Sequence, residues 1–438
     1  MKDAVTHAGR RVALASALLL CAGCHASGPS LQQTGSKPAL PEPQKRLIPT
    51  VNIAPATGWA AGEQPTAASG LEANAFAGGL AHPRWLHVLP NGDVLVAESN
   101  APPKPAETGF RAWVMKKVMG RAGAGVPSAN RITLLRDADG DGVAETRSVF
   151  LSGLRSPFGM ALVGDRLYIA NTDSVVSMAW HAGMTQATET PRMLASLPGG
   201  PRNHHWTKSL VASPDGRYLY VGVGSNSNVA ENGMEEEVGR AAIHEIGLQD
   251  GRQRVFATGL RNPVGLVWEP DSRALWAVVN ERDELGDELV PDYLTAVREG
   301  AFYGWPYSYY GAHVDARVKP PRPDLVAKAI APDYALGSHV APLGLSFADG
   351  ARLPGFGQGA FVGLHGSWNR RALAGYKVVF VPFADGRPNG EPREVLTGFV
   401  DAKGNARGRP VGVAIAADGS LLVADDVGNR VWRVSAAK

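Results

Sequence analysis

The chain has 438 residues, of which 44% are hydrophobic and 19% are charged. This composition excludes a disordered, coiled-coil or collagen-like chain and predicts a soluble globular protein with a large core. The formal net charge is +3, and three basic residues and one acidic residue stand among the first eleven, so the remainder is close to neutral. A near-neutral chain without a basic run gives no reason to expect nucleic acid as a partner.

The N-terminus carries the pattern of an export signal. Residues 2–11 form a basic region, residues 12–20 (VALASALLL) are apolar, and residues 22–24 (AGC) form a small-residue cleavage site. The pattern resembles a bacterial lipoprotein signal, which implies a signal peptide over 1–23 and lipidation of Cys24. We therefore expect an exported protein, periplasmic or at the cell surface, that is attached to a membrane through its N-terminal lipid. The alternatives are an ordinary secretory peptide and, from Arg10-Arg11, a twin-arginine signal.

The rest of the chain divides into a linker and a β-rich body. Residues 24–70 are rich in Pro, Ser and Ala without periodicity, which predicts a flexible tether. Over 71–438, short apolar runs alternate with Asn-Gly, Gly-Asp and Asp-Gly pairs, the pattern of β-hairpins. Within a predicted insertion at about 108–124, residues 110–122 (FRAWVMKKVMGRA) have the spacing of an amphipathic helix. That helix either packs over the edge of the fold or faces a partner or a membrane.

A weak internal repeat organises the hairpins. Five segments share one pattern, in which a short loop leads to a proline and then to an apolar stretch. They are GGLAHPRWL at 78–86, SGLRSPFGM at 152–160, TGLRNPVGL at 258–266, SHVAPLGLS at 338–346 and GRPVGVAIA at 408–416. The segment NHHWTKSLV at 203–211 adds a sixth unit. Repeated four-stranded units predict an all-β fold, a six-bladed β-propeller. The lead-in loops before each unit should then meet at one end of the central channel.

One acidic turn has the spacing of a cation site. Asp137, Asp139 and Asp141 alternate in RDADGDGVAET, so three carboxylates can converge on a structural calcium ion. The alternative is an acidic turn whose side chains accept hydrogen bonds from its own backbone amides.

The lead-in loops contain a second group of candidate residues. His204 and His205 lie in one loop, Arg261 and Asn262 in the next, and Arg409 in the last. An imidazole suited to proton abstraction, beside arginines and an amide, favours a planar anionic ligand that accepts charge during a reaction. The alternative for the paired histidines is a structural, hydrogen-bonded role. The acidic loop NERDELGDEL at 280–289 could add a divalent cation.

Five motifs in a fixed order give this pattern a family resemblance. They are NHHWTKSLVASPDG, GLRNPVGLVWEP, EGAFYGWPYSYYG, FVGLHGSWNR and GRPVGVAIAADGSLLVADD. Together they resemble the glucose/sorbosone dehydrogenase family, six-bladed propellers that use pyrroloquinoline quinone (PQQ) and calcium, and are most similar to its sorbosone branch. The resemblance covers about residues 75–436. It implies oxidation of a sugar, a sugar aldehyde or a polyol by hydride transfer to the quinone.

The resemblance also implies roles for individual residues. His205 falls on the general base, and Arg261 on a catalytic position that stabilises negative charge on the quinone oxygen. Cofactor-binding roles fall on Arg261, Asn262, Arg282, Asp283, Arg370 and Arg409, of which Arg370 is a substitute for a lysine of the family. The backbone carbonyls of Arg282 and Asp283 would hold the calcium bound to PQQ. Because the chain has no Cys-x-x-Cys-His motif, electrons would pass to an external acceptor, a cytochrome or a quinone.

The sequence departs from the family pattern at two site positions. Val411 stands where the family has a second arginine, and Ser225 stands where a carboxylate would orient the base. Glu231 or Glu236 could support His205 instead. These departures keep a non-catalytic binding propeller open as an alternative, and a calcium-dependent lactonase is a further one.

Three aromatic residues near these motifs have two readings. Trp206, Tyr303 and Trp305 either offer apolar faces to a sugar or a quinone ring, or pack inside the blades.

Overall fold

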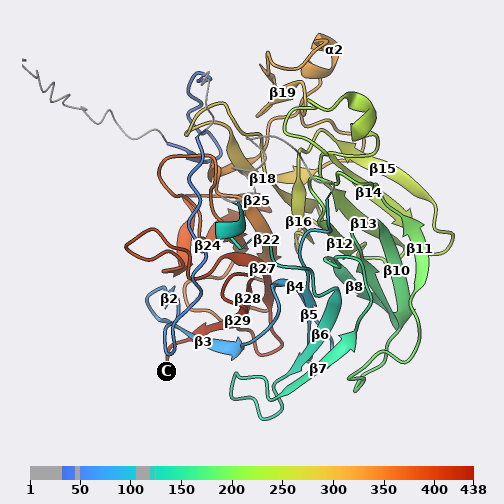
Figure 1. The fold of residues 1–438 in the computed structure, drawn as a ribbon, viewed down its shortest axis with the longest axis vertical. Helices are drawn as coiled ribbons and strands as arrows, with labels where there is room; N and C mark the ends of the chain where they lie inside the picture. Colours follow the sequence, from blue (N-terminus) through green and yellow to red (C-terminus); the bar gives the residue numbers. More distant parts are fainter. Residues whose placement is uncertain (1–31, 45–49, 105–118, 124) are drawn as a thin grey trace, which may run out of the picture. The chain divides into compact units, whose positions relative to one another are not determined.

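The computed structural model describes residues 32–44, 50–104, 119–123 and 125–438. These residues form a six-bladed β-propeller, as the sequence predicted. Each blade is an antiparallel sheet, and the first strand of each blade stands nearest the centre (Figure 1).

The strands of the first three blades follow one another in the chain. The first blade consists of β4 (Pro83–Val88), β5 (Val94–Glu98), β6 (Arg131–Arg136) and β7 (Thr146–Leu151). The second consists of β8 (Met160–Val163), β9 (Arg166–Ala170), β10 (Ser174–Ala179) and β11 (Arg192–Ser196). The third consists of β12 (Lys208–Ala212), β13 (Tyr218–Val223), β14 (Ala242–Gly247) and β15 (Gln253–Thr258).

The last three blades continue the pattern and close the ring. The fourth contains β16 (Pro263–Trp268), β17 (Leu275–Val279), β18 (Pro291–Val297) and β21 (Tyr334–Ser338). The fifth contains β22 (Pro342–Phe347), β23 (Gly359–Leu364), β24 (Lys377–Ala384) and β26 (Arg393–Thr397), with β25 (Arg387–Pro388) paired to β24. The sixth joins β27 (Pro410–Ile415), β28 (Leu421–Asp425) and β29 (Arg430–Ala436) to β3 (Leu71–Ala77), so an early strand completes the last blade.

Short elements lie in the connections between these strands. They are the hairpin of β19 (Ser308–Tyr309) and β20 (His313–Val314), the 3-10 turn η1 (Met234–Glu237) and the helical turn α2 (Pro323–Val326). No helix among the described residues is long and apolar enough to cross a membrane.

Burial follows the position of a strand in its blade. The second strands, such as β5 (VLVAE) and β17 (LWAVV), are buried at every residue because neighbouring blades cover both faces of the sheet. In the outer strand β7, exposed and partly buried residues alternate along most of the strand, and most residues of the outer strand β11 are exposed or partly exposed. The apolar runs that the sequence shows as hairpins are therefore the interior of each blade.

A repeated glycine sets the distance between neighbouring blades. It is the second residue after the proline of the repeat in four units, at Gly159, Gly265, Gly344 and Gly412. A methyl group on Gly344 would overlap the carbonyl oxygen of Val411 in the next first strand. The first strands of adjacent blades contact one another around a closed ring. The glycines allow this contact because a side chain would force the strands apart.

The segment that precedes the propeller differs from the predicted tether. In the described part of 24–70, β1 (Thr34–Gly35) pairs with β21 and β2 (Thr66–Ala67) pairs with β26. The indole of Trp59 donates to the buried carboxylate of Asp425, at 2.7 Å. Backbone pairing needs no particular side chain, so composition alone did not reveal it. Residues 32–44 and 50–70 are thus attached to the blades, and a flexible tether there was wrong.

Two other predictions fall largely outside the described residues. The signal peptide and Cys24 lie before residue 32. Of the insertion at about 108–124, the structure describes residues 119–123, and residues 119–121 are helical. Both stay predictions.

The close approach at Gly344 can be tested by substitution. Gly344→Ala should lower the free energy of unfolding by about 3 kcal/mol, because the added methyl group must displace the backbone of the next blade. Gly357→Ala is the matched control in the same blade, since its added methyl group meets open space. Chemical denaturation measures both. Equal stability of the two variants would contradict this account of the ring.

Candidate functional site

The lead-in loops meet at one end of the ring and enclose a cavity of about 460 Å³. This volume lies in the range of small-molecule sites. The polar lining includes His82, Arg84, Asn100, His204, His205, Arg261, Asn262, Asn280, Asp283, His339, His365, Arg409 and Asp426. Ile53, Met119, Trp368 and Val427 supply apolar parts of the wall. The predicted convergence of His205, Arg261, Asn262 and Arg409 is therefore observed.

His205 is held in one orientation by the strand end beside it. Its Nδ1 lies 2.8 Å from the carbonyl oxygen and 3.1 Å from the hydroxyl of Ser225. A carbonyl only accepts a hydrogen bond, so Nδ1 carries the proton and Nε2 of the neutral ring keeps its lone pair. Burial lowers the pKa of His205 well below its usual value, and the nearby His204 and Arg261 lower it further. His205 is thus a neutral base candidate.

A glycine brings His205 and Asn262 together. Gly224 follows β13 and lies between them, and a Cβ at this position would overlap both side chains. The Oδ1 atom of Asn262 is buried without a hydrogen-bond partner among the described residues. An unpaired buried acceptor is costly, so this amide is suited to a ligand that donates to it.

Arg261 is fixed by oxygen atoms of two loops. Its guanidinium donates to the carbonyl of Glu281 at 2.6 Å and to the side chain of Asn228 at 3.1 Å. It also lies 3.2 Å from Asp283, whose other oxygen lies 3.4 Å from Nδ1 of His339. Burial would raise the pKa of Asp283, but His339 and Arg261 lower it overall. This wall therefore places a cation beside the imidazole and keeps Asp283 ionised.

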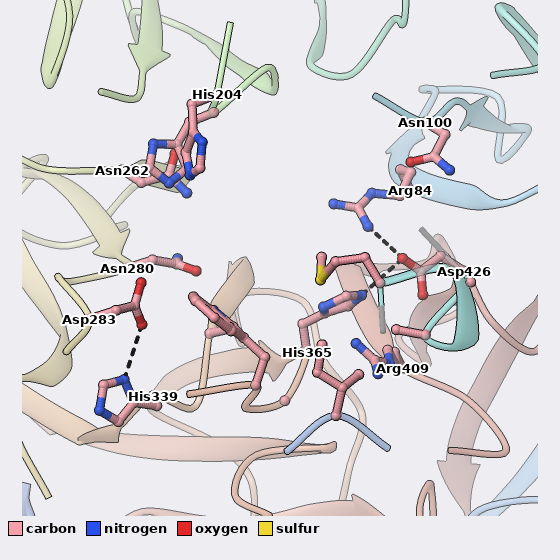
Figure 2. A pocket seen from close by; sticks show the side chains of 18 of the residues that line it. Arg84, Asn100, His204, Asn262, Asn280, Asp283, His339, His365, Arg409 and Asp426 are labelled. Atoms are coloured by element: carbon pink, nitrogen blue, oxygen red, sulfur yellow. Dashed lines mark hydrogen bonds and ion pairs between the residues drawn. The ribbon is translucent and has the colours of Figure 1, made fainter. Parts of the chain in front are cut away.

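A second charged group forms the opposite side of the cavity (Figure 2). Asp426 accepts from Arg84 at 2.5 Å and pairs with Nε2 of His365 at 2.9 Å. Nδ1 of His82 lies 3.8 Å from the same carboxylate. Burial alone would raise the pKa of Asp426, but His365 and Arg84 hold it well below its usual range. One carboxylate thus faces several basic groups, and Arg409 adds another cation on this side (Figure 2).

Two predicted cofactor residues lie elsewhere. Arg370 donates to the carbonyl of Ser338 at 3.1 Å and to Glu288 at 2.8 Å, and it does not line the cavity. The fully buried side chain of Arg282 pairs with Glu281, which lines the cavity, and with Asp315; Arg282 and Asp315 do not line it. Both side chains therefore stabilise loops in this structure, and Arg370, which was expected to bind the cofactor in place of a lysine, does not line the cavity.

The predicted calcium contact at Asp283 also disagrees with the structure. The backbone carbonyl of Asp283 accepts from Arg317 at 2.9 Å and from the amide of Asn228 at 3.2 Å. A carbonyl oxygen has two lone pairs, and both are already directed to donors. The guanidinium of Arg317 also brings a positive charge to the place where the cation would bind. The residues present do not fit this carbonyl as a calcium ligand.

Other expected partners pack in different places. Glu231 accepts from the backbone amides of Asn228 and Val229, and Glu236 accepts from Asn226. Ser225 itself, rather than either glutamate, therefore orients His205.

The three aromatic candidates pack inside the fold. Trp206 belongs to the core between blades, Tyr303 donates to Ala296, and Trp305 donates to Asn228. None of the three lines the cavity, whereas Trp368 does.

The acidic turn lies outside this cavity. Asp137, Asp139 and Asp141 gather with Glu145, with one oxygen of each within 4.8 Å of the others. Their carboxylates accept hydrogen bonds from backbone amides of the same turn, as at Gly140 and Gly142. These contacts match the alternative of an acidic turn whose side chains accept hydrogen bonds from its own backbone amides. Calcium binding at this turn stays a prediction.

Sequence reasoning missed Arg84, His365 and Asp426. The lead-in loops of the repeat did contain Arg84, directly after its proline. His365 and Asp426 follow the second strands β23 and β28. Because the second strand is antiparallel to the first, its C-terminal end lies at the same end of the channel as the lead-in loops. The residue that directly follows each second strand could therefore have been predicted to lie near the cavity.

The pairing of Asp426 predicts a pH-dependent stability. Because its pKa is lowered in the folded state, its contribution is present above the unfolded carboxyl pKa of about 4 and is lost as pH falls below it. Asp426→Asn should cost about 3 kcal/mol at pH 7, since Arg84 stays buried without its partner. The difference from the unaltered protein should shrink toward pH 3 in denaturant titrations.

The control is Asp173→Asn, which breaks a more exposed pair with Arg155. It should cost less than about 1 kcal/mol. A cost for Asp426→Asn that is small, or equal at pH 7 and pH 3, would contradict the prediction.

Comparison with known proteins agrees with this architecture. The sequence profile of the glucose/sorbosone dehydrogenase family matches residues 164–433. An uncharacterized protein of Borreliella burgdorferi is 30% identical over 301 residues, which cover 64% of this chain and 76% of that protein. A pyrroloquinoline quinone-dependent pyranose dehydrogenase of Coprinopsis cinerea is 25% identical over 324 residues, covering 58% of this chain but less than half, 43%, of the enzyme.

A solved structure extends the comparison to the fold. The holo form of the PQQ domain of pyranose dehydrogenase from Coprinopsis cinerea is similar with a TM-score of 0.67 and 22% identity, covering 88% of this chain and 100% of that domain. The fold is shared, and the family profile spans more than half of the chain. This protein belongs to the glucose/sorbosone dehydrogenase family.

Proposed function

We propose that this protein is a PQQ-dependent dehydrogenase of a sugar, a sugar aldehyde of the sorbosone type or a polyol, with His205 as general base. The observation that carries the proposal is that His205, Arg261 and Asn262 line the same cavity as Arg84 and Arg409. Asn262 lies across this cavity from Arg84 and Arg409 (Figure 2). The relative named as a pyrroloquinoline quinone-dependent pyranose dehydrogenase supports the proposal.

The residues of the cavity fit a flat, anionic cofactor. PQQ carries carboxylate groups, and the Nε atoms of Arg84 and Arg409 are buried without hydrogen-bond partners among the described residues. Buried donors of this kind gain most from an anionic acceptor. Arg84, Arg409 and His365 would hold the carboxylates, and Arg261 and Asn262 would contact the quinone. When bound, PQQ supplies the hydride acceptor that protein side chains lack.

The chain itself would handle the proton. With Nδ1 bonded to Ser225, the lone pair of His205 Nε2 takes the proton of the substrate hydroxyl. Burial and the charges of His204 and Arg261 lower the pKa of this imidazole, so it stays neutral, with a free lone pair, at pH values somewhat below 6.5. Arg261 is held by backbone oxygens, so its charge is positioned before any negative charge develops beside it.

Calcium is not given a part in this proposal. The occupied carbonyl of Asp283 does not offer the main-chain ligand that the family resemblance implies. Proton transfer to His205 and the charge of Arg261 need no metal ion, and PQQ titration with and without calcium tests whether binding requires the metal.

Export and electron transfer complete the proposal. The N-terminal pattern supports a periplasmic or cell-surface enzyme held by a lipid on Cys24. Electrons would leave to an external cytochrome or quinone acceptor.

Cofactor binding is the first test. The protein without its signal peptide should bind PQQ, measured by quinone absorbance and by a rise in melting temperature. Arg261→Ala should weaken binding about 10-fold or more, because a charged hydrogen bond in a buried site is lost. Arg217→Ala, at an exposed hairpin, is the control. The titration is run with and without calcium.

If the unaltered protein does not bind PQQ in either condition, the dehydrogenase proposal is overturned and a binding propeller is favoured. PQQ binding that requires calcium would instead contradict the proposal that the site works without a metal ion.

The base is tested by its pH profile. His205→Gln should lower kcat/KM about 100-fold or more while leaving PQQ binding within a few-fold. In the unaltered enzyme, a base with a lowered pKa stays neutral to lower pH, so the acid limb of kcat/KM should fall below pH 6.5. His181→Gln, an exposed site, should leave both unchanged. Near-normal turnover by His205→Gln would exclude it as the base.

A further inference from the structure

One part of the cavity wall comes from the segment before the propeller. Residues 50–57, here called the strap, lie along the loop that leads into β27. The strap and this loop exchange backbone bonds: Ala406 donates to the carbonyl of Pro55 at 2.7 Å, and Thr57 donates to the carbonyl of Ala406 at 2.8 Å. Ala54 is 1% exposed and packs in the same core cluster as Tyr376. The strap is therefore an ordered part of the fold.

The strap also joins two other loops that line the cavity. The amide of Asn52 donates to the carbonyl of Trp368 at 2.9 Å, and the amide of Ala56 donates to the carbonyl of Arg121 at 2.8 Å. On the fifth blade, Asn369 donates to the carbonyl of Thr50 at 2.6 Å. Ile53 lies between these contacts and lines the cavity itself. The strap thus connects three separate parts of one wall.

Arg409 depends on this segment for its position. One guanidinium nitrogen donates to the carbonyl of Ala54 at 3.0 Å. The guanidinium lies over the ring of Tyr376, 5.2 Å from its centroid, and is 6% exposed as a residue. A carbonyl and an aromatic face orient the cation without neutralising its charge, in contrast to a carboxylate. The charge of Arg409 thus remains available to an anionic ligand.

We propose that the strap is a positioning element of the binding site, and that its Ala54 carbonyl holds Arg409 for a carboxylate of the ligand. This inference rests on the proposed function for the identity of the ligand, PQQ. It goes beyond that function by assigning part of the affinity to a segment outside the family match and the blades.

The test loosens the strap without shortening the chain. The variant Ala54→Gly/Pro55→Gly keeps β1, β2, the length between them and the cavity-lining Ile53. The control is Ala60→Gly/Ala61→Gly, two exposed positions later in the same segment. PQQ dissociation constants are measured by quinone absorbance for both variants. The strap variant should bind about 10-fold more weakly, and the control should bind as the unaltered protein does.

A second experiment, in proteins that carry Arg409→Ala, separates the positioning of Arg409 by the strap from a general loosening of the cavity wall. In proteins that already carry Arg409→Ala, the strap variant should cause no further loss of affinity, because its effect passes through Arg409. An equal loss in both backgrounds, or no loss in either, would overturn the inference while PQQ binding by the unaltered protein leaves the proposed function standing.

Hydrogen exchange supplies a readout that needs no cofactor. The amides of Ala56, Thr57 and Ala406 should exchange slowly in the unaltered protein and faster in the strap variant. Fast exchange at these amides in the unaltered protein would overturn the inference. If PQQ fails to bind but this protection is present and is lost in the variant, the proposed function falls and the strap stays as the support of Arg409.

Discussion

The close contact between first strands of neighbouring blades is the constraint on which the structure depends. At Gly344 and Gly412, the backbone of one blade approaches the backbone of the next without an intervening side chain. This spacing closes the ring, and the pairing of β3 with β29 completes it. With the ring closed, six loops from distant parts of the sequence are brought to one end of a single channel. The cavity is a consequence of that geometry.

The cavity separates two kinds of chemistry. On one side, His205 is anchored by a carbonyl and stands near Arg261, which keeps the imidazole neutral. On the other side, Asp426 gathers Arg84 and His365 and remains ionised. Burial strengthens the influence of Arg261 on His205 and the influence of Arg84 and His365 on Asp426, because charges buried beside one another are poorly screened by water. A neutral base and an anion-binding surface can therefore face one ligand.

Main-chain atoms do much of the positioning in this site. Ser225 replaces the expected carboxylate beside His205 by offering its carbonyl oxygen. Glu281 and Ala54 offer theirs to Arg261 and Arg409. A carbonyl fixes a donor without adding a negative charge, so Arg409 keeps its attraction for an anionic ligand, whereas Arg261 also pairs with the carboxylate of Asp283 at 3.2 Å. The departure at Ser225 is in this sense compensated by the backbone, which no residue pattern displays.

The sequence by itself determined the all-β propeller and its blade positions, because hairpin signals and the proline repeat are local features. It also identified several of the side chains that meet in the cavity, among them His204, His205, Arg261, Asn262 and Arg409. These lie in lead-in loops, whose common location follows from the repeat.

Only the tertiary structure decided which other residues join them. It brought Arg84, His365 and Asp426 into the site and directed Arg282 and Arg370 away from it, because side-chain direction at a loop depends on neighbours far along the chain. It likewise turned residues 50–57 from an expected tether into a wall of the cavity. Backbone hydrogen bonds made that attachment, and they form between any residues that the fold brings within reach.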